Sequence, residues 1–277
     1  MSPSAIGTAI GTQLGIILLA GLIIFSGHLV KGVSGFGSAL FSVPLLMFIL
    51  DVKFVTPVFL LFDLASGAML VATNYRSIHR RLLLLLLCGL LAGTALGTWV
   101  LLSFSHVLLK RILGVLVTGW AAWTLVARQR PTNQAVAGEY TREAGEYTRV
   151  AGEYTRERDR TMRILAPLSG FLGGALGAMF SVNGPPIIIY LSHVLEGKQA
   201  FRATLYGIFF ADACYKLVLF SANGLLSGRV LGFALLMAPF LVAGTCAGAW
   251  LQKYMDQALF GKVVAAILVV TGVMLLI

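Results

Sequence analysis

The chain has 277 residues, of which 58% are hydrophobic and only 12% are charged, and its mean hydropathy is +0.89. A soluble domain carries about 25% charged residues, so this composition excludes an ordinary soluble protein. The net charge of +10 does not indicate nucleic-acid binding, because the basic residues lie mostly in short links between apolar runs. In such links positive charge sets membrane topology. The composition predicts an all-α, polytopic membrane protein.

The apolar pattern predicts ten segments. The first has no Lys or Arg before it and is followed by Lys31, which predicts a retained helix with an outward N-terminus. Segment 36–50 would reach only about 22 Å as a helix, against a hydrocarbon core of about 30 Å, and segment 184–195 is shorter still. Both are expected to be short or discontinuous, which leaves eight to ten membrane segments. The ten segments are 14–30, 36–50, 54–74, 82–103, 107–127, 164–180, 184–195, 204–222, 230–250 and 259–277.

A polar stretch separates two apolar halves. We predict an N-terminal transmembrane repeat over 1–127, a cytoplasmic linker over 128–163 and a C-terminal transmembrane repeat over 164–277. The linker holds three tandem heptapeptides, which start at Ala137, Ala144 and Ala151. Because these units lack the paired large apolar residues of a coiled coil, they predict a flexible or loosely helical loop. A partner-binding segment is the alternative.

The two halves share sequence as well as hydropathy. AGTALGTW (residues 92–99) recurs as AGTCAGAW (residues 243–250). Polar residues also recur inside apolar segments, which indicates an internal duplication. The paired polar positions are Lys53 with Arg202, Asp63 with Asp212 and Asn74 with Asn223, and Pro44, which follows a Gly-rich run, similarly pairs with Pro186.

The distribution of positive charge predicts the topology. Five crossings in each half place both termini outside and the heptapeptide linker inside, so that the second repeat is inverted relative to the first, as in many transporters. The loops expected in the cytoplasm carry Arg76, Arg80, Arg81, Lys198, Arg202 and Lys253, in addition to the arginines of the linker.

Two glycine-rich stretches, KGVSGFGSALFSVPLL (residues 31–46) and GFLGGALGAMFSVNGPPIIIYL (residues 170–191), interrupt the apolar pattern. Glycine and proline allow the backbone to leave helical geometry, and a helix that restarts after a break directs N–H groups at the gap. Two matching breaks predict an anion site near the membrane midplane, whereas the alternative is that the glycines only allow close helix packing. The substrate-binding candidates at the breaks are Ser34, Gly35, Phe36, Gly37, Ser38, Asn183, Gly184 and Pro185.

These stretches resemble the TauE/SafE family of sulfite and organosulfonate exporters. The likeness extends over most of the chain through its size, duplicated halves and central loop, although the heptapeptides are not part of the family pattern. The resemblance implies transport of small anions, often sulfur-containing, across the cytoplasmic (inner) membrane. The residues that carry it are Gly32, Gly35, Gly37, Pro44, Gly173, Gly174, Gly177, Gly184, Pro185 and Pro186.

Charged residues inside membrane helices are costly and indicate function. Lys216 lies one turn after Asp212, so the two can form a structural ion pair; equally, a carboxylate in a low-dielectric site can carry a proton. Asp63 has Gly67 where Asp212 has Lys216, which makes Asp63 the better candidate for proton coupling. Lys216 is also a candidate to bind substrate.

Three further sets of residues are candidates for function or packing. Arg202 is a candidate to attract anions, with interfacial anchoring as the alternative. His28 and His193 are candidates for proton coupling or substrate binding, with packed polar residues as the alternative. The series Gly89, Gly93 and Gly97 predicts a small-xxx-small helix contact.

The sequence favours a secondary transporter of small anions over an anion channel, an assembly subunit or a membrane-embedded enzyme, and the family resemblance implies sulfite or an organosulfonate as the substrate. It holds no P-loop, no HExxH motif and no cysteine-histidine cluster, and we expect no catalytic activity, metal or cofactor. The expected partners are a small anion and the lipid bilayer, not nucleic acid, and the oligomeric state is open.

Overall fold

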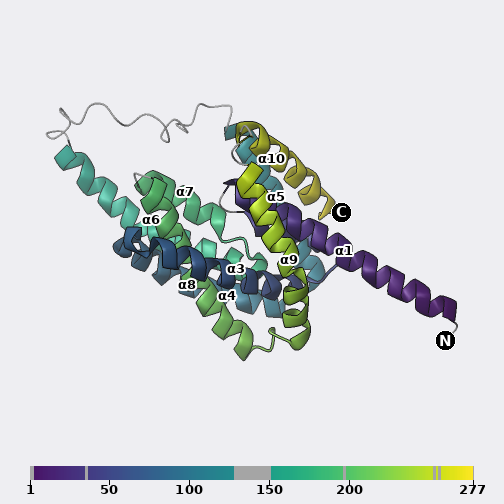
Figure 1. Ribbon diagram of the computed structural model, residues 1–277. Helices are drawn as coiled ribbons and strands as arrows, with labels where there is room; N and C mark the ends of the chain where they lie inside the picture. Colours follow the sequence, from purple (N-terminus) through teal and green to yellow (C-terminus); the bar gives the residue numbers. More distant parts are fainter. Residues whose placement is uncertain are drawn as a thin grey trace. The chain divides into compact units, whose positions relative to one another are not determined.

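The computed structural model describes residues 3–34, 37–127, 151–195, 198–251, 254 and 257–276 (Figure 1). The regular structure of these ranges is helical, with no strand among them. The helices are α1 (Pro3–Ser34), α2 (Ser38–Leu46), α3 (Val52–Asn74), the 3-10 helix η1 (Tyr75–Ser77), α4 (Arg80–Ser103), α5 (His106–Ala127), α6 (Ala151–Phe180), α7 (Gly184–Val194), α8 (Lys198–Ala222), α9 (Gly228–Leu251) and α10 (Gln257–Met274).

The predicted all-α membrane fold is confirmed. Each predicted apolar segment corresponds to one helix, and five helices in the described ranges are long and apolar enough to cross a membrane. The short helices α2 and α7 have 9 and 11 residues, so they reach only about 14 and 17 Å. Neither helix can cross a hydrocarbon core of about 30 Å alone, as the sequence predicted.

Helix α6 begins earlier than hydropathy suggested. It starts at Ala151, whereas the apolar pattern predicted residue 164, so the third heptapeptide is helical and continuous with the membrane segment. The other two heptapeptides lie outside the described residues. Hydropathy marks only the part of a helix that sits in lipid, and the Glu and Arg residues of 151–163 favour its extension because both have high helix propensity.

The helices group into two compact units, and each unit takes helices from both halves of the sequence. The first contains residues 1–59, 104–125 and 225–277, with α1 packed on α9 and α2. The second contains residues 60–103 and 126–224, with α4 packed on α6 and α8. The compact units therefore differ from the predicted repeats, whose assignment by sequence stays a prediction.

Helices α4 and α6 approach so closely that side chains are excluded from their contact. A Cβ atom on any of three glycines of α4 would overlap a backbone carbonyl of α6, which confirms the predicted small-xxx-small contact. Gly170 and Gly174 of α6 are equally close to the backbone of α4. The facing pairs are Gly89 with Pro167, Gly93 with Phe171 and Gly97 with Ala175.

The same contact recurs between α9 and α1 in the first unit. Gly244 and Gly248, the counterparts of Gly93 and Gly97 in the repeated motif, face the carbonyl oxygens of Phe25 and Leu29. Phe25 and Leu29 precede Phe171 and Ala175 by one constant interval. A duplicated packing motif would produce this recurrence, with the fourth helix of one repeat packed on the first helix of the other.

Candidate functional site

The break between α6 and α7 is built by three local features. Ser181 has a φ of 55°, in the left-handed region, so α6 stops at Phe180. Asn183 takes the N-cap position of α7 without a side-chain capping bond. Pro185 and Pro186 follow in the first turn, where a missing N–H is tolerated. The amide of Asn183 is thereby left available for other partners.

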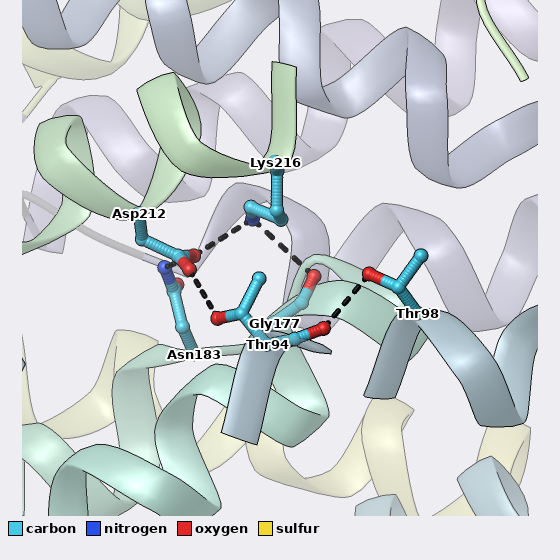
Figure 2. A network of polar contacts seen from close by, with 6 residues as sticks. All are labelled: Thr94, Thr98, Gly177, Asn183, Asp212 and Lys216. Carbon is cyan, nitrogen blue, oxygen red and sulfur yellow. Dashed lines mark hydrogen bonds and ion pairs between the residues drawn. The ribbon is translucent and has the colours of Figure 1, made fainter. Parts of the chain in front are cut away.

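A buried ion pair lies beside this break. Lys216 Nζ is 2.9 Å from Asp212 Oδ2, one turn apart on α8. Their side chains are 1% and 0% exposed, so neither charge is solvated. Figure 2 shows Asp212 directed toward Asn183, at the N-cap of α7, and Lys216 directed toward Gly177 of α6.

Two further donors complete the surroundings of the Asp212 carboxylate. Thr94 Oγ1, on α4, donates to Oδ1 at 2.7 Å. Asn183 Nδ2 donates to Oδ2 at 3.1 Å. The carboxylate thus receives a hydroxyl, an amide and an ammonium group from three separate segments of the chain (Figure 2).

The ammonium group of Lys216 has a second partner. It donates to the carbonyl oxygen of Gly177 at 3.3 Å, near the C-terminal end of α6. This end of a helix carries carbonyl groups without intrahelical partners and a partial negative charge, so a cation is favourable there. Thr98, one turn after Thr94, donates to the Thr94 carbonyl at 2.8 Å and extends the network along α4.

Gly177 leaves the space that the carboxylate needs. A Cβ atom there would lie 2.9 Å from Cβ of Asn183 and 3.1 Å from Oδ2 of Asp212. Either contact would push the amide or the carboxylate out of place. A glycine at this position is therefore part of the site and not only of the helix packing.

A buried ion pair is a poor source of stability, because desolvation offsets most of its Coulomb attraction. Removing one partner is different, since it leaves an uncompensated buried charge and costs about 3–5 kcal/mol. The hydrogen bonds from Thr94 and Asn183 offset part of the desolvation of Asp212. Burying such a pair therefore costs free energy that the pair does not fully recover, which favours a functional role over a purely structural one.

The structure brings together part of the predicted site. Asp212 contacts both Asn183 and Lys216, and Gly184 and Pro185 directly follow Asn183. Arg202 is exposed and lies ten residues before Asp212 on α8, about 15 Å along the helix. His193 is also exposed, and its Nδ1 lies 2.7 Å from the carbonyl of Ile189. Neither of these two belongs to the buried network.

The carboxylates Asp63 and Asp212 have different surroundings. Asp212 is fully buried, whereas Asp63 on α3 is half-buried. Gly67, the counterpart of Lys216, instead packs against Phe210 of α8. The predicted preference for Asp63 as the proton carrier stays a prediction.

The break between α1 and α2 lies in the first unit. Gly35 and Phe36 fall outside the described residues, as does the side chain of Ser34. Gly37 has a φ of 90° and Ser38 is buried, so α2 begins after a left-handed residue. Since the two breaks belong to different units, a single site shared between them stays a prediction.

His28 is also in the first unit. Its side chain is 2% exposed, its Nδ1 lies 2.9 Å from the carbonyl of Ile24, and its ring stacks on Phe59 with centroids 6.2 Å apart. This is the environment of a packed histidine with a satisfied ring nitrogen. A role in proton coupling stays a prediction.

One predicted equivalence is wrong. Pro44 lies inside α2 toward its C-terminal end, whereas Pro186 lies in the first turn of α7. The left-handed residue, and not the proline, marks both breaks, with Gly37 before α2 and Ser181 after α6. The prolines also make α7 poorer in donors, because Pro185 and Pro186 supply no N–H groups at its N-terminus.

Sequence reasoning missed Thr94, Thr98 and the Gly177 carbonyl. Thr94 and Thr98 lie within AGTALGTW, which was recognised only as a repeated motif. Their spacing of one turn on the glycine-lined face of a helix was the available signal. Across the described ranges, no three His, Cys, Asp or Glu side chains are grouped to hold a metal ion.

A multi-pass helical membrane protein with two interrupted segments, and with a buried charge pair hydrogen-bonded beside one of them, has the architecture of a membrane transporter. The family model described as "Sulfite exporter TauE/SafE" matches residues 17–275, nearly the whole chain. The chain belongs to this family. No curated protein and no solved structure matches it.

Proposed function

We propose that this membrane transporter carries a small sulfur oxyanion, sulfite or an organosulfonate, across the cytoplasmic membrane as a secondary, proton-coupled carrier. Membership of the sulfite exporter family supports an anionic, sulfur-containing substrate. The observation that carries the proposal is the buried pair of Asp212 and Lys216 beside the interrupted helix. A lone structural pair would not require a broken helix next to it.

The site offers the groups that an oxyanion needs. Lys216 supplies a positive charge, while Asn183 and Thr94 supply neutral donors in a water-poor environment. Charge-assisted hydrogen bonds of this kind are stronger than neutral ones. The substrate would bind where α6 gives way to α7, since at this point the chain leaves helical geometry beside the buried charges.

The proposal is tested by transport in liposomes. The purified protein is reconstituted, and uptake of sulfite, sulfoacetate, taurine and sulfate is measured with and without a pH gradient. We expect saturable uptake of a sulfur oxyanion that a proton gradient increases and that Asn183→Ala reduces. Uptake that does not saturate would indicate a channel instead, and absence of flux for every anion under both conditions would reject the proposal.

A further inference from the structure

The Asp212 carboxylate occupies a position that is equipped for an anion. Its oxygens accept from the hydroxyl of Thr94 at 2.7 Å and from the amide of Asn183 at 3.1 Å, and the ammonium of Lys216 lies at 2.9 Å. These donors come from α4, from the N-cap of α7 and from α8. A hydroxyl, an amide and an ammonium group are also suitable donors to the oxygens of a sulfonate or a hydrogensulfite ion.

We infer that the Asp212 carboxylate is an internal substitute for the transported anion, and that a monovalent oxyanion replaces it at Lys216 when Asp212 takes up a proton. This inference rests on the proposed function. It adds the order of events at the site and the charge of the substrate, neither of which follows from membership of the family.

The charge balance leads to this exchange. With Asp212 ionised, one negative and one positive charge neutralise each other in a site that excludes water. When a proton binds to the carboxylate, its charge is lost and the charge of Lys216 is unpaired. A monovalent anion then restores neutrality, so that one proton moves with one anion. A divalent anion such as sulfate leaves one negative charge uncompensated, which is costly at low dielectric.

In the described part of the chain, the contacts of the Asp212 carboxylate include one charged partner. Among the described residues, Lys216 is the charged side chain in contact with Asp212. The groups that α4, α6 and α7 bring to the pair are the hydroxyl of Thr94, the carbonyl of Gly177 and the amide of Asn183, none of which titrates. Protonation of Asp212 is therefore the event that frees Lys216.

The second contact of Lys216 keeps the cation in place during the exchange. Its ammonium also donates to the Gly177 carbonyl at 3.3 Å, which lies on a different helix from Asp212. When the carboxylate is neutral, this bond and the negative end of α6 continue to hold the ammonium beside the break. The anion thus finds a fixed positive charge next to the donors that Asp212 has released.

Binding of a fixed-charge probe to the purified full-length protein tests the inference. Methanesulfonate is the monovalent probe and sulfate the divalent one. Affinity is obtained from the rise in unfolding temperature with probe concentration, at about pH 5 and at about pH 8. The variants are Asp212→Asn, which mimics the protonated carboxylate, and the double variant Asp212→Asn with Lys216→Gln, which removes both charges and leaves the site neutral.

We expect the affinity of the unmodified protein for methanesulfonate to fall about tenfold per pH unit once Asp212 is ionised, because one proton is linked to one anion. Asp212→Asn should bind methanesulfonate with less than about a twofold change across the same range. The double variant should show no saturable stabilisation by methanesulfonate. Sulfate strengthens burial non-specifically, so any stabilisation by sulfate should be equal in the three proteins.

Equal affinity of the unmodified protein at both pH values would overturn the inference, as would absence of methanesulfonate binding to a folded Asp212→Asn variant. If that variant does not fold, the inference is tested by the pH dependence of methanesulfonate affinity in the unmodified protein alone. Anion flux into liposomes distinguishes failure of this inference from failure of the proposed function. Binding as expected without flux of any anion rejects the function and keeps the exchange at Lys216, whereas proton-driven flux with pH-independent binding rejects only the exchange.

Discussion

Thr94 Oγ1 donates a hydrogen bond of 2.7 Å to Asp212 Oδ1 across 118 positions of sequence, and both residues are fully buried. The bond joins α4, from the first half of the sequence, to α8, from the second half. The candidate site is therefore assembled from both halves of the sequence and does not belong to either half alone. Thr245 occupies the position of Thr94 in the recurring motif, but it makes a different bond, because its hydroxyl donates to the carbonyl of Leu241 on the same helix.

Thr94→Val should destabilise the protein by about 1–2 kcal/mol and reduce transport. The change keeps the shape of the side chain but removes a charge-assisted hydrogen bond to a buried carboxylate. Unfolding in detergent and the rate of anion uptake in liposomes measure the two effects.

Thr245→Val is the matched control. Its hydroxyl is bonded within one helix in the first unit, so we expect a change in stability within about 0.5 kcal/mol and unchanged transport. Equal effects of the two substitutions would show that the contact of Thr94 with Asp212 contributes nothing beyond that of an ordinary helical threonine.

Gly93→Ala should destabilise the protein by about 1–3 kcal/mol, because the added Cβ would overlap the carbonyl of Phe171 on α6. The glycine lies in a backbone-to-backbone contact, so no flexible side chain can move aside. Thermal unfolding of the purified protein measures the effect.

Gly232→Ala on α9 provides the comparison. No atom lies within 4 Å of the Cβ position there, and alanine has the higher helix propensity. Stability should stay the same or rise by up to about 1 kcal/mol. A loss of stability similar to that of Gly93→Ala would mean that glycine is required for a reason other than helix contact.

Gly37→Ala should cost about 1–2 kcal/mol through the backbone alone, because φ is 90° and the Cβ position is open. Gly224→Ala should cost a similar amount, since φ is 69° and its Cβ position is also open. The two substitutions are therefore matched in stability. They differ in place, because Gly37 precedes α2 at a helix break and Gly224 follows α8 in a connecting loop.

The rate of anion uptake in liposomes distinguishes Gly37→Ala from Gly224→Ala. If the α1–α2 break takes part in transport, Gly37→Ala should lower uptake per folded molecule and Gly224→Ala should not. Equal uptake by both variants would remove the α1–α2 break from the mechanism. Gly37→Asn should recover part of the loss, since asparagine tolerates the left-handed conformation.

Single cysteines should show the N-terminus outside and the linker inside. Cys88, Cys214 and Cys246 are free and exposed on their helices, so all three are first replaced by serine. A cysteine introduced at Ser2 should then react with an impermeant maleimide in intact cells, whereas one at Ala137 should react only after the membrane is opened. Labelling of both from the same side would contradict the inverted topology.

The positions of the helices and the pairing of Asp212 with Lys216 could be predicted from the sequence, for physical reasons. A membrane helix must satisfy its backbone internally and present apolar side chains to lipid, so hydropathy identifies it directly. Asp212 and Lys216 are one turn apart on one helix, and the helical period alone places them together. The interruption before Gly184 was signalled by consecutive prolines.

The contacts between helices could not be predicted from the sequence in the same way. Thr94 meets Asp212 because glycines set the distance and register of α4 on α6, and a single sequence does not specify which helices pair. Pro44 was misread because a proline can lie inside a helix, as Pro44 does in α2, and does not mark a break by itself. The start of α6 was missed because hydropathy does not detect helix outside lipid.

The pairing of α1 with α9 has a consequence for biosynthesis. Helix α1 is synthesised before α2 to α8, yet the helix on which its glycine-lined backbone packs, α9, follows all of them. While α2 to α8 are inserted, α1 therefore lies in the lipid with that face uncovered, and the first unit cannot close until α9 has been made. A chain interrupted in the linker should accordingly yield two fragments that assemble only when both are made in the same membrane.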